Sequence, residues 1–300
     1  MATATKPIST SSRLALLQAP ALKKIPWLVH GFSTRPGGAS VCYGGKSLNL
    51  GFTKDDSRDH VEQNRRKLLA AMGATSDRMT WPLTSLRQIH SDIIHLVESP
   101  AADPLIGDGL ITNRPGIALA VMTADCLPVM LIDKKNRAVG VFHAGWRGTV
   151  QRITEKGLGA MRCHFGSMPS DIEAVIGPGI GGCCYEVGEE LKSKFESQFA
   201  YASELFHQVF ESDPIREKYP MLFMNARAPG HGDPCAKLHL DLAEANRRQV
   251  LAMGVPDDQI TVLGQCTACN PTKFFSHRAE KGKTGRMMAV VGISPFSRTN

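Results

Sequence analysis

The segment 123–147, TADCLPVMLIDKKNRAVGVFHAGWR, carries two apolar runs and, at their ends, a cysteine and a histidine. The runs Val129–Ile132 and Ala138–Phe142 are separated by polar, turn-forming residues, and this pattern predicts two buried strands. Cys126 precedes the first run, and His143 follows the second. We therefore expect His143 at a strand end, where loop geometry lets side chains converge on a cleft.

Similar patterns extend this arrangement along the chain. Further strands are predicted at Trp27–Ser33, Ile93–Val97, Leu110–Thr112, Ile117–Met122, Ala174–Ile176, Ile260–Leu263 and Met287–Ile293. Helices are predicted at Ser57–Met72, Thr149–Cys163, Glu189–Phe199 and Asp241–Met253, a turn at 34–38 and a long surface loop at 211–237. The sequence thus predicts the α+β class, with a mixed β-sheet core that is flanked by helices.

Length and composition predict one compact domain. The 300 residues contain neither an internal repeat nor a clear linker, and no apolar run is long enough to span a bilayer. The start of the chain is rich in Ser and Thr and lacks the apolar core of a secretory signal. We predict a disordered N-terminal tail at 1–25, a single catalytic domain at 26–300, a cytoplasmic location and no membrane partner.

The cysteine pattern indicates the redox state of the thiols, and the net charge indicates which partners are favoured. Cys183 and Cys184 are adjacent, so a mutual disulfide would be strained, while Cys266 and Cys269 form a lone CxxC that is a weak metal or redox signal. We expect reduced, ordinary thiols. The net charge of +7 favours anionic partners such as phosphate. With scattered basic residues and only 6% aromatic residues, we expect no nucleic-acid surface.

Two interpretations of the reactive residues remain open. The segment Arg87-Gln-Ile-His90-Ser91 supplies a second histidine. Together, His90, Cys126 and His143 are a ligand set for Zn²⁺ that leaves one coordination position open for water or substrate. The alternative is a thiolate nucleophile at Cys126 that one of the histidines activates. Both interpretations need an apposed Cys–His pair.

The residues after His143 predict an anion site. Gly145 and Gly148 allow close backbone approach, and the predicted helix begins beside Arg147. Free N–H groups at a helix start and a nearby guanidinium are suited to binding phosphate. The alternative is that Arg147 is an ordinary surface residue and that the glycines only form a turn.

A series of short motifs between His30 and Ile293 resembles one known family. The motifs are HGFSTRPGG at 30–38, QIHS at 88–91, DGLIT at 108–112, TADCLP at 123–128, HAGWRG at 143–148, GGCCYEVG at 181–188, Asp241-Leu242 with Asn246, and FFSHR at 274–278 with Gly285-Arg286. The chain resembles the laccase-domain family of YfiH type, also called polyphenol oxidase-like proteins or multi-activity purine nucleoside phosphorylases. Its fold is related to that of the cytotoxic necrotizing factors.

The resemblance implies a metal site and a reaction. It places the metal ligands at His90, Cys126 and His143. It implies zinc-supported phosphorolysis of adenosine, inosine, guanosine and S-methyl-5′-thioadenosine, and deamination of adenosine. The expected partners are therefore a purine nucleoside and phosphate, and the expected state is a monomer or homodimer. The family also suggests two alternatives, a Cys–His amidase that acts on a peptidoglycan precursor and a copper-binding polyphenol oxidase.

Further residues are assigned from their chemistry and from these motifs. Asp125 and Glu186 are candidates for proton transfer or for orienting a histidine. Arg147 is the first candidate for holding phosphate, with Arg35, Arg278 and Arg286 as the others. Copper is compatible with a Cys and two His ligands. However, the sequence has no His-x-His pair of the kind that a multicopper oxidase needs.

Overall fold

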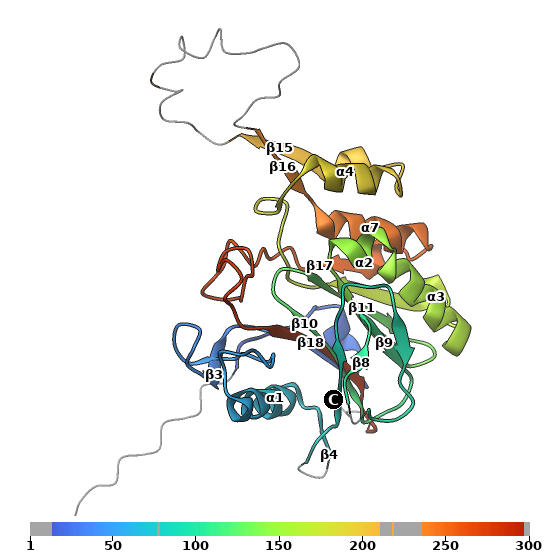
Figure 1. The fold of residues 1–300 in the computed structure, drawn as a ribbon. Helices are drawn as coiled ribbons and strands as arrows, with labels where there is room; N and C mark the ends of the chain where they lie inside the picture. The colour runs from blue at the N-terminus through green and yellow to red at the C-terminus, as the bar shows by residue number, and fades with distance from the viewer. Residues whose placement is uncertain (1–13, 77–78, 102, 211–217, 219–235, 297–300) are drawn as a thin grey trace, which may run out of the picture.

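Two six-stranded sheets pack face to face and form the centre of the molecule (Figure 1). The computed structural model describes residues 14–76, 79–101, 103–210, 218 and 236–296. Within these residues, both sheets contain parallel and antiparallel pairs, and helices cover their outer faces. This arrangement confirms the predicted α+β class with a mixed sheet core, although two main sheets make up that core.

In the first sheet, a strand from near the N-terminus, β2, lies beside the last strand of the chain that the structure describes, β18. The order of this sheet is β1-β2-β18-β10-β6-β8. Strand β18 pairs with both β2 and β10 in antiparallel fashion, whereas β6 is parallel to β10. The strands are β1 (Leu16–Leu17), β2 (Leu28–Ser33), β18 (Met287–Ile293), β10 (Ala118–Thr123), β6 (Leu83–Arg87) and β8 (Leu105–Ile106).

The second sheet is built around the hairpin that the segment 123–147 predicts. Its order is β17-β13-β11-β12-β9-β7, and β11 and β12 are antiparallel neighbours. All seven residues of each of these two strands are buried, as expected for strands that are covered on both faces. The strands are β17 (Ile260–Val262), β13 (Ile172–Ile176), β11 (Leu127–Asp133), β12 (Ala138–Ala144), β9 (Gly109–Thr112) and β7 (Ile94–Leu96).

The alternation of side chains along the strands divides the core into three layers. Between the sheets, Leu119 and Val291 of the first sheet pack in one cluster with Met130 and Val141 of the second. Side chains of opposite parity, such as Val129, point to the outer faces and contact the helices. Since successive residues of a strand face opposite sides, each central strand contributes to two layers.

Each outer face has its own helices. α1 (Arg58–Met72) covers the first sheet, and α3 (Ile153–Phe165) and α7 (Leu242–Ala252) cover the second (Figure 1). The side chains of Ser57 and Asp241 cap α1 and α7, because each accepts a hydrogen bond from the N–H group three residues later.

The predicted helix 149–163 is wrong in one respect, since the chain forms two helices there. The short helix α2 (Trp146–Val150) ends at Gln151, and α3 begins after Arg152, which has a φ of 63°. A left-handed residue cannot continue a right-handed helix, so the chain turns at this point. α2 itself begins at Trp146, three residues after His143.

A smaller sheet stands beside this core. It has the order β14-β16-β15 and, with α4 (Glu189–Glu196), projects above α7 in Figure 1. Its strands are β14 (Glu186–Val187), β16 (Ala236–Leu240) and β15 (Phe206–Phe210). A short hairpin joins β4 (Thr75–Ser76) and β5 (Met79–Thr80), and short 3-10 helices lie at Leu22–Lys24, Pro169–Asp171, Ala202–Leu205 and Asp257–Gln259.

Three predicted boundaries change. The tail does not extend to residue 25, because β1 pairs with β2 and Leu22 is fully buried; residues 1–13 lie outside the described part. The predicted turn at 34–38 overlaps strand β3 (Pro36–Ser40). Most of the predicted loop 211–237 lies outside the described residues, and its last two positions belong to β16. The single catalytic domain at 26–300 stays a prediction.

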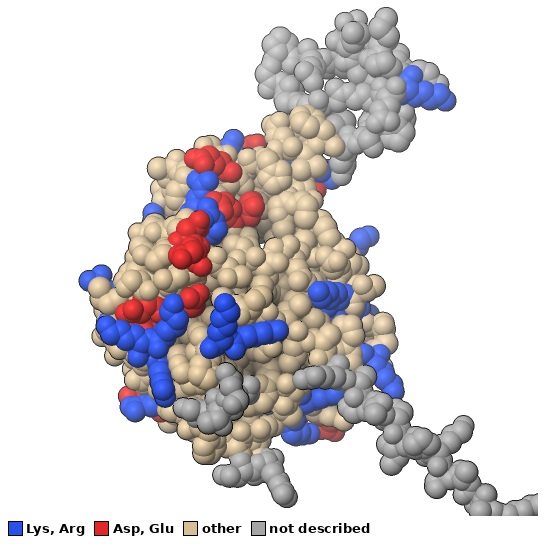
Figure 2. Space-filling view, turned by 180° about the vertical axis from the view of Figure 1, so that it is seen from behind, with Lys and Arg blue, Asp and Glu red and all other residues tan. Residues whose placement is uncertain are grey.

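The described residues give information on membrane-spanning helices and on the distribution of surface charge. Within the described residues, none of the helices has the length and apolar character needed to cross a membrane. Figure 2 shows basic side chains interspersed with acidic ones on one face. Ion pairs among the described residues include Arg248–Glu244 and Lys134–Glu173.

Candidate functional site

Three side chains from distant parts of the chain meet beside β12. His90 lies in the loop after β6, Cys126 lies between β10 and β11, and His143 belongs to β12. One nitrogen of each histidine and the Cys126 sulfur all lie within 4.8 Å of one another. The distance from Cys126 Sγ to His90 Nε2 is 3.9 Å, and the two imidazole rings meet edge to face with their centroids 4.9 Å apart. The structure thus brings together the predicted ligand set.

A buried carboxylate orients one of these histidines. Asp108 is fully buried in front of β9, and its Oδ1 lies 2.8 Å from Nδ1 of His143. The backbone N–H of His143 also donates to the carbonyl of Asp108 at 2.8 Å. A carboxylate at Nδ1 favours a proton on that nitrogen and therefore leaves Nε2 of His143 directed at the site.

The same carboxylate shapes the loop that carries the other histidine. The backbone N–H groups of Ile89 and Ser91, together with the Ser91 hydroxyl, donate to Asp108 Oδ2. The N–H of His90 donates to Oδ1 at 3.1 Å. His90 has a φ of 59°, which a non-glycine residue rarely adopts. These hydrogen bonds offset the cost of the left-handed conformation and hold the His90 ring near Cys126.

The electrostatics of the site favour a thiolate. Burial raises the pKa of the Cys126 thiol, but the adjacent His143 and His90 outweigh it and lower the pKa to about 6. Burial likewise lowers the pKa of His143, but Cys126 and Asp108 raise it to about 9. Asp108 is held ionised, with a pKa of about 2, by its hydrogen bonds to His143 and Ser91, which exceed the opposing effect of burial. A thiolate is the form of cysteine that binds metals or attacks electrophiles.

A glycine leaves room for the site. A Cβ added at Gly145 would lie 2.9 Å from Cys126 Sγ and 3.1 Å from Cδ2 of His90. The first of these distances is shorter than a real Cβ contact, so a side chain at this position would displace the sulfur. The close backbone approach that was predicted at Gly145 therefore occurs next to Cys126 and His90.

The donor set fits a transition-metal ion. One thiolate and two imidazoles suit Zn²⁺ and are also compatible with copper. Asp108 supplies the carboxylate partner that metal-ligating histidines commonly have. His90, Cys126 and His143 line a cavity of about 590 Å³, and an ion held by these three ligands would keep one position for water or substrate.

This cavity gathers basic and polar side chains around the three candidate ligands. Arg87, Arg278 and Arg286 are its arginines, and Tyr185 and His277 add an aromatic ring and an imidazole. The remaining lining residues are Leu86, Gln88, Met122, Ala124, Asp125 and Ile180. A cavity lined by three arginines and an aromatic residue is suited to a ligand that contains both an anion and an apolar ring.

Two of the predicted arginines line this cavity. The Arg278 guanidinium donates to the carbonyl of Glu186 at 2.9 Å and lies over the Tyr185 ring. Arg286 donates to the carbonyls of Thr284 and Gly285, each at 3.0 Å. Each contact fixes part of the guanidinium group and restricts its conformational freedom.

The other two predicted arginines lie elsewhere. Arg147 is exposed on α2, stacks over Trp146 at 4.4 Å and is absent from the cavity lining. Arg35 pairs with Glu280 at 3.0 Å and donates to the carbonyl of Tyr43. Closeness to His143 in sequence did not bring Arg147 into the cavity, since α2 carries its side chain outward.

The two predicted acidic residues have different surroundings. Asp125 lines the cavity and has a φ of 88°, but its carboxylate accepts hydrogen bonds from the Thr267 hydroxyl and the Arg278 N–H, each at 2.6 Å. It therefore ties two loops together. Glu186 is exposed, pairs with Lys237 at 3.1 Å and lies in an adjacent hollow outside the main cavity.

Several residues at the site were not assigned from sequence. Asp108 and Gln88 appeared in the sequence analysis only as parts of motifs. The Gln88 side-chain amide forms two hydrogen bonds of 2.7 Å with the backbone of Met122. Tyr185, His277 and Arg87 also line the cavity. For Asp108, the available signal was a carboxylate directly before a buried strand, close to the predicted site.

Comparison with known proteins gives a consistent result. The family described as multi-copper polyphenol oxidoreductase laccase matches residues 29–294. A purine nucleoside phosphorylase of Deinococcus radiodurans is 37% identical over 285 residues, which are 95% of each chain. The Escherichia coli protein named purine nucleoside phosphorylase YfiH is 35% identical over 87% of this chain and 92% of its own length.

Solved structures show the same fold. The structure of a Bacillus licheniformis hypothetical protein YfiH has a TM-score of 0.77 and 32% identity, and covers 95% of this chain and 98% of its own. That of YlmD from Geobacillus stearothermophilus has a TM-score of 0.74 and 31% identity, with the same coverage. Together with the matched residues 29–294, these likenesses show that the chain belongs to the laccase-like YfiH family, whose curated relatives include purine nucleoside phosphorylases.

Proposed function

We propose that the protein is a zinc-dependent purine nucleoside phosphorylase that acts on adenosine, inosine, guanosine and S-methyl-5′-thioadenosine. The names of its relatives support this class of reaction. The main structural support is the convergence of His90, Cys126 and His143 at a cavity that also holds three arginines. The cavity volume of about 590 Å³ is in the usual range for small-molecule sites.

In this reaction, a phosphate oxygen forms a bond to C1′ of the ribose as the bond between C1′ and N9 of the purine breaks. The purine leaves with the bond electrons and takes up a proton, which gives free base and ribose 1-phosphate. We assign binding of the phosphate dianion to Arg278 and Arg286, since both line the cavity and a guanidinium forms charge-assisted hydrogen bonds with phosphate. The Tyr185 ring offers an apolar surface for a purine.

The three candidate ligands would hold the zinc ion. When bound, zinc supplies a Lewis acid that polarises an oxygen or nitrogen atom of the substrate. Asp108 keeps the Nδ1 proton on His143 and so maintains its Nε2 as an electron-pair donor. Copper in place of zinc would use the same donors.

Deamination of adenosine is the second activity that we propose. It requires water at C6 of the purine and a group that carries a proton to the leaving ammonia. Known zinc deaminases use the glutamate of a His-x-Glu motif, which this sequence lacks. Asp125 is the acidic residue that lines the cavity, and His277 is an imidazole at the same cavity. We assign the proton carrier to this pair of residues.

One arrangement favours a second candidate function, a Cys–His hydrolase or amidase. Cys126 has a lowered pKa beside His143, and Asp108 holds the far nitrogen of that imidazole. Thiol hydrolases use this order of thiolate, imidazole and orienting polar group. In that case the substrate would be an amide, such as that of a peptidoglycan precursor.

Phosphorolysis is tested with the purified full-length protein and inosine. We expect hypoxanthine and ribose 1-phosphate to form only with phosphate present, and we expect Cys126→Ser to abolish turnover. Cys163→Ser is the matched control, because Cys163 is an exposed thiol on α3. No turnover of any of the four nucleosides by the zinc-loaded protein would contradict the proposal.

Inhibition separates the candidate functions. In a zinc enzyme the bound ion protects Cys126 from iodoacetamide, and activity is lost with a chelator and regained with added Zn²⁺, whereas in a thiol hydrolase iodoacetamide alkylates Cys126 and abolishes activity without prior chelation. Activity with a catechol and oxygen that requires copper would favour a polyphenol oxidase. The same preparation, analysed by sedimentation, tests the proposed monomer or homodimer.

A further inference from the structure

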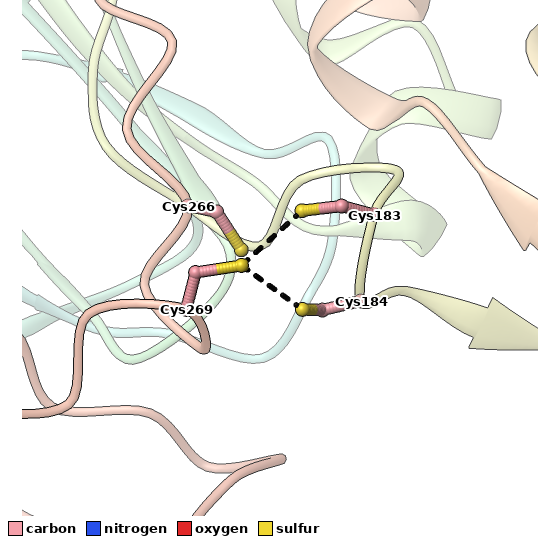
Figure 3. Close-up of side chains that lie close together, drawn as sticks. All are labelled: Cys183, Cys184, Cys266 and Cys269. Carbon is pink, nitrogen blue, oxygen red and sulfur yellow. Dashed lines mark hydrogen bonds between the residues drawn. The ribbon is translucent and has the colours of Figure 1, made fainter.

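Four cysteines form a second cluster outside the predicted ligand set. Cys183 and Cys184 come from the loop before β14, and Cys266 and Cys269 come from the loop after β17. Their sulfur atoms all lie within 4.8 Å of one another. Figure 3 shows Cys183 and Cys184 pointing toward Cys269, with sulfur separations of 3.4 and 3.3 Å. We call these residues the four-cysteine cluster.

The backbone holds the two loops in register. The N–H of Thr267 donates to the carbonyl of Gly179 at 2.9 Å, beside an isolated parallel bridge between Gly179 and Cys266. The first loop is a tight turn, because the N–H groups of Cys184 and Tyr185 both donate to the carbonyl of Gly181. The convergence of the sulfurs therefore rests on a defined backbone arrangement.

A backbone N–H group donates a hydrogen bond to one sulfur of the four-cysteine cluster. The N–H of Gly181 donates to Sγ of Cys266 at 3.3 Å. Such a hydrogen bond stabilises negative charge on sulfur, and hydrogen bonds of this kind around metal-bound sulfurs orient and tune the ligands. A Cβ at Gly181 would lie 3.3 Å from Cys183 Sγ and 3.3 Å from Cys266 Cβ, which is tight. The glycine keeps the space between the loops open.

The geometry points to a structural Zn²⁺ ion bound by the four-cysteine cluster, which we propose as a second metal site of this protein. Four thiolates are a closed tetrahedral set for zinc, with no position left for substrate. Zinc–sulfur bonds of about 2.3 Å in a tetrahedron place the sulfurs about 3.8 Å apart. The observed separations of 3.3 and 3.4 Å, within a group that spans at most 4.8 Å, need only small adjustments.

The site would connect the two loops that line the cavity. Cys184 is followed by Tyr185, which lines the cavity. Thr267, between the two cysteines of the second loop, donates to Asp125 at 2.6 Å, and Asp125 precedes Cys126. A metal ion that binds both loops therefore stabilises one wall of the cavity without contacting the substrate.

Metal analysis of the full-length protein tests the site. We expect about two zinc ions per chain in the wild type and about one in Cys269→Ser. Cys126→Ser should lose the other ion and keep the one at the cluster, and the double variant should bind none. Cys163→Ser should keep both. Circular dichroism checks that each variant is folded.

A second measurement uses the wild type alone. Cys183, Cys269 and Cys163 are all exposed, so a small alkylating reagent can reach each of them. If zinc binds Cys183 and Cys269, they react at least tenfold more slowly than Cys163 in the purified protein. Removal of the metal by a chelator should speed the alkylation of both residues, and Cys269 should reach a rate similar to that of Cys163.

Three results would overturn the proposal. These are alkylation of Cys183 and Cys269 at the rate of Cys163 before chelation, a disulfide within the cluster in the non-reduced wild type, and an unchanged zinc content in folded Cys269→Ser. None of these results depends on nucleoside turnover. Failure of the proposed enzyme activity therefore leaves this test intact.

Discussion

Asp108 joins the two candidate metal-binding histidines, since one of its oxygens lies 2.8 Å from Nδ1 of His143 and the other binds the loop that carries His90. The residue is fully buried and ionised, and its hydrogen bonds compensate the cost of burial. Through this one carboxylate, the loop after β6 and strand β12 keep a fixed spacing. Cys126 occupies the position between them.

Replacing this carboxylate should weaken the site without removing a ligand. In Asp108→Asn, the amide NH2 cannot accept the N–H of Ile89 and the two hydrogen bonds from Ser91. We expect metal affinity and kcat/KM to fall about 10- to 100-fold, as for other partners of metal-ligating histidines. Metal titration and phosphorolysis kinetics measure this. Asp92→Asn, which removes only a surface ion pair with Lys156, should leave both quantities unchanged. An equal loss in the two variants would argue against a specific role for Asp108.

Gly145→Ala tests the space around Cys126. The added Cβ meets the Cys126 sulfur at 2.9 Å, so we expect most of the metal at this site and of the activity to be lost. Backbone strain is not the cause, because Gly145 has a φ of −75°. Gly159→Ala on α3 is the matched control, since its Cβ meets no atom within 4 Å and it should stabilise the helix by up to about 1 kcal/mol. Zinc content and thermal unfolding report the outcomes, and full zinc occupancy in Gly145→Ala would contradict the steric argument.

The placement of the arginines predicts which of them binds phosphate. Arg278→Ala should raise the KM for phosphate about 10- to 100-fold, the equivalent of losing a hydrogen bond to a charged group. Arg147→Ala should change it less than twofold, because this side chain stacks on Trp146 outside the cavity. Phosphate saturation curves at a fixed inosine concentration measure both values. A larger effect at Arg147 would restore the ranking that its closeness to His143 in sequence suggested.

Acid should destabilise the fold through His30. This histidine is 2% exposed in β2, and burial lowers its pKa from 6.5 to about 4, although the backbone of Ala19 opposes the shift. Above pH 6.5 both the folded and unfolded states hold it neutral. Between pH 6.5 and 4 only the unfolded state takes up the proton, so the free energy of unfolding should fall by up to about 3 kcal/mol. Urea unfolding across this pH range measures the slope. His30→Asn should reduce the slope, and an unchanged slope would show that other groups cause it.

Local signals in the sequence predicted much of the fold. The helices α1 and α7 have both periodic apolar faces and side-chain caps, Ser57 and Asp241, and both occur as expected. Runs such as Val129–Ile132 lie inside longer buried strands. Strand β6 was not predicted, because Leu83–Arg87 mixes polar and apolar residues over a short length. The break between α2 and α3 depends on the conformation of Arg152, which residue type alone does not indicate.

Those parts of the candidate site that lie in recognisable sequence motifs could be predicted. The resemblance assigned His90, Cys126 and His143 as ligands, and the structure places their donor atoms together, while the ligand role itself stays a prediction. Arg147 was chosen for its closeness in sequence, and helix geometry turned it away. The four-cysteine cluster was missed because Cys184 and Cys266 are far apart along the chain. The parallel pairing of β13 with β17 and the bridge between Gly179 and Cys266 bring their loops together.

The position of β18 has a consequence for how the protein is made. This strand lies between β2 and β10 in the sheet, yet it is synthesised after both. More than half of the 300-residue chain separates the end of β10 from the start of β18. While the ribosome is still translating the intervening segment, β2 and β10 each present an unpaired edge, and such edges promote aggregation. The two strands can therefore take their final places in the first sheet only after residues 287–293 have been synthesised.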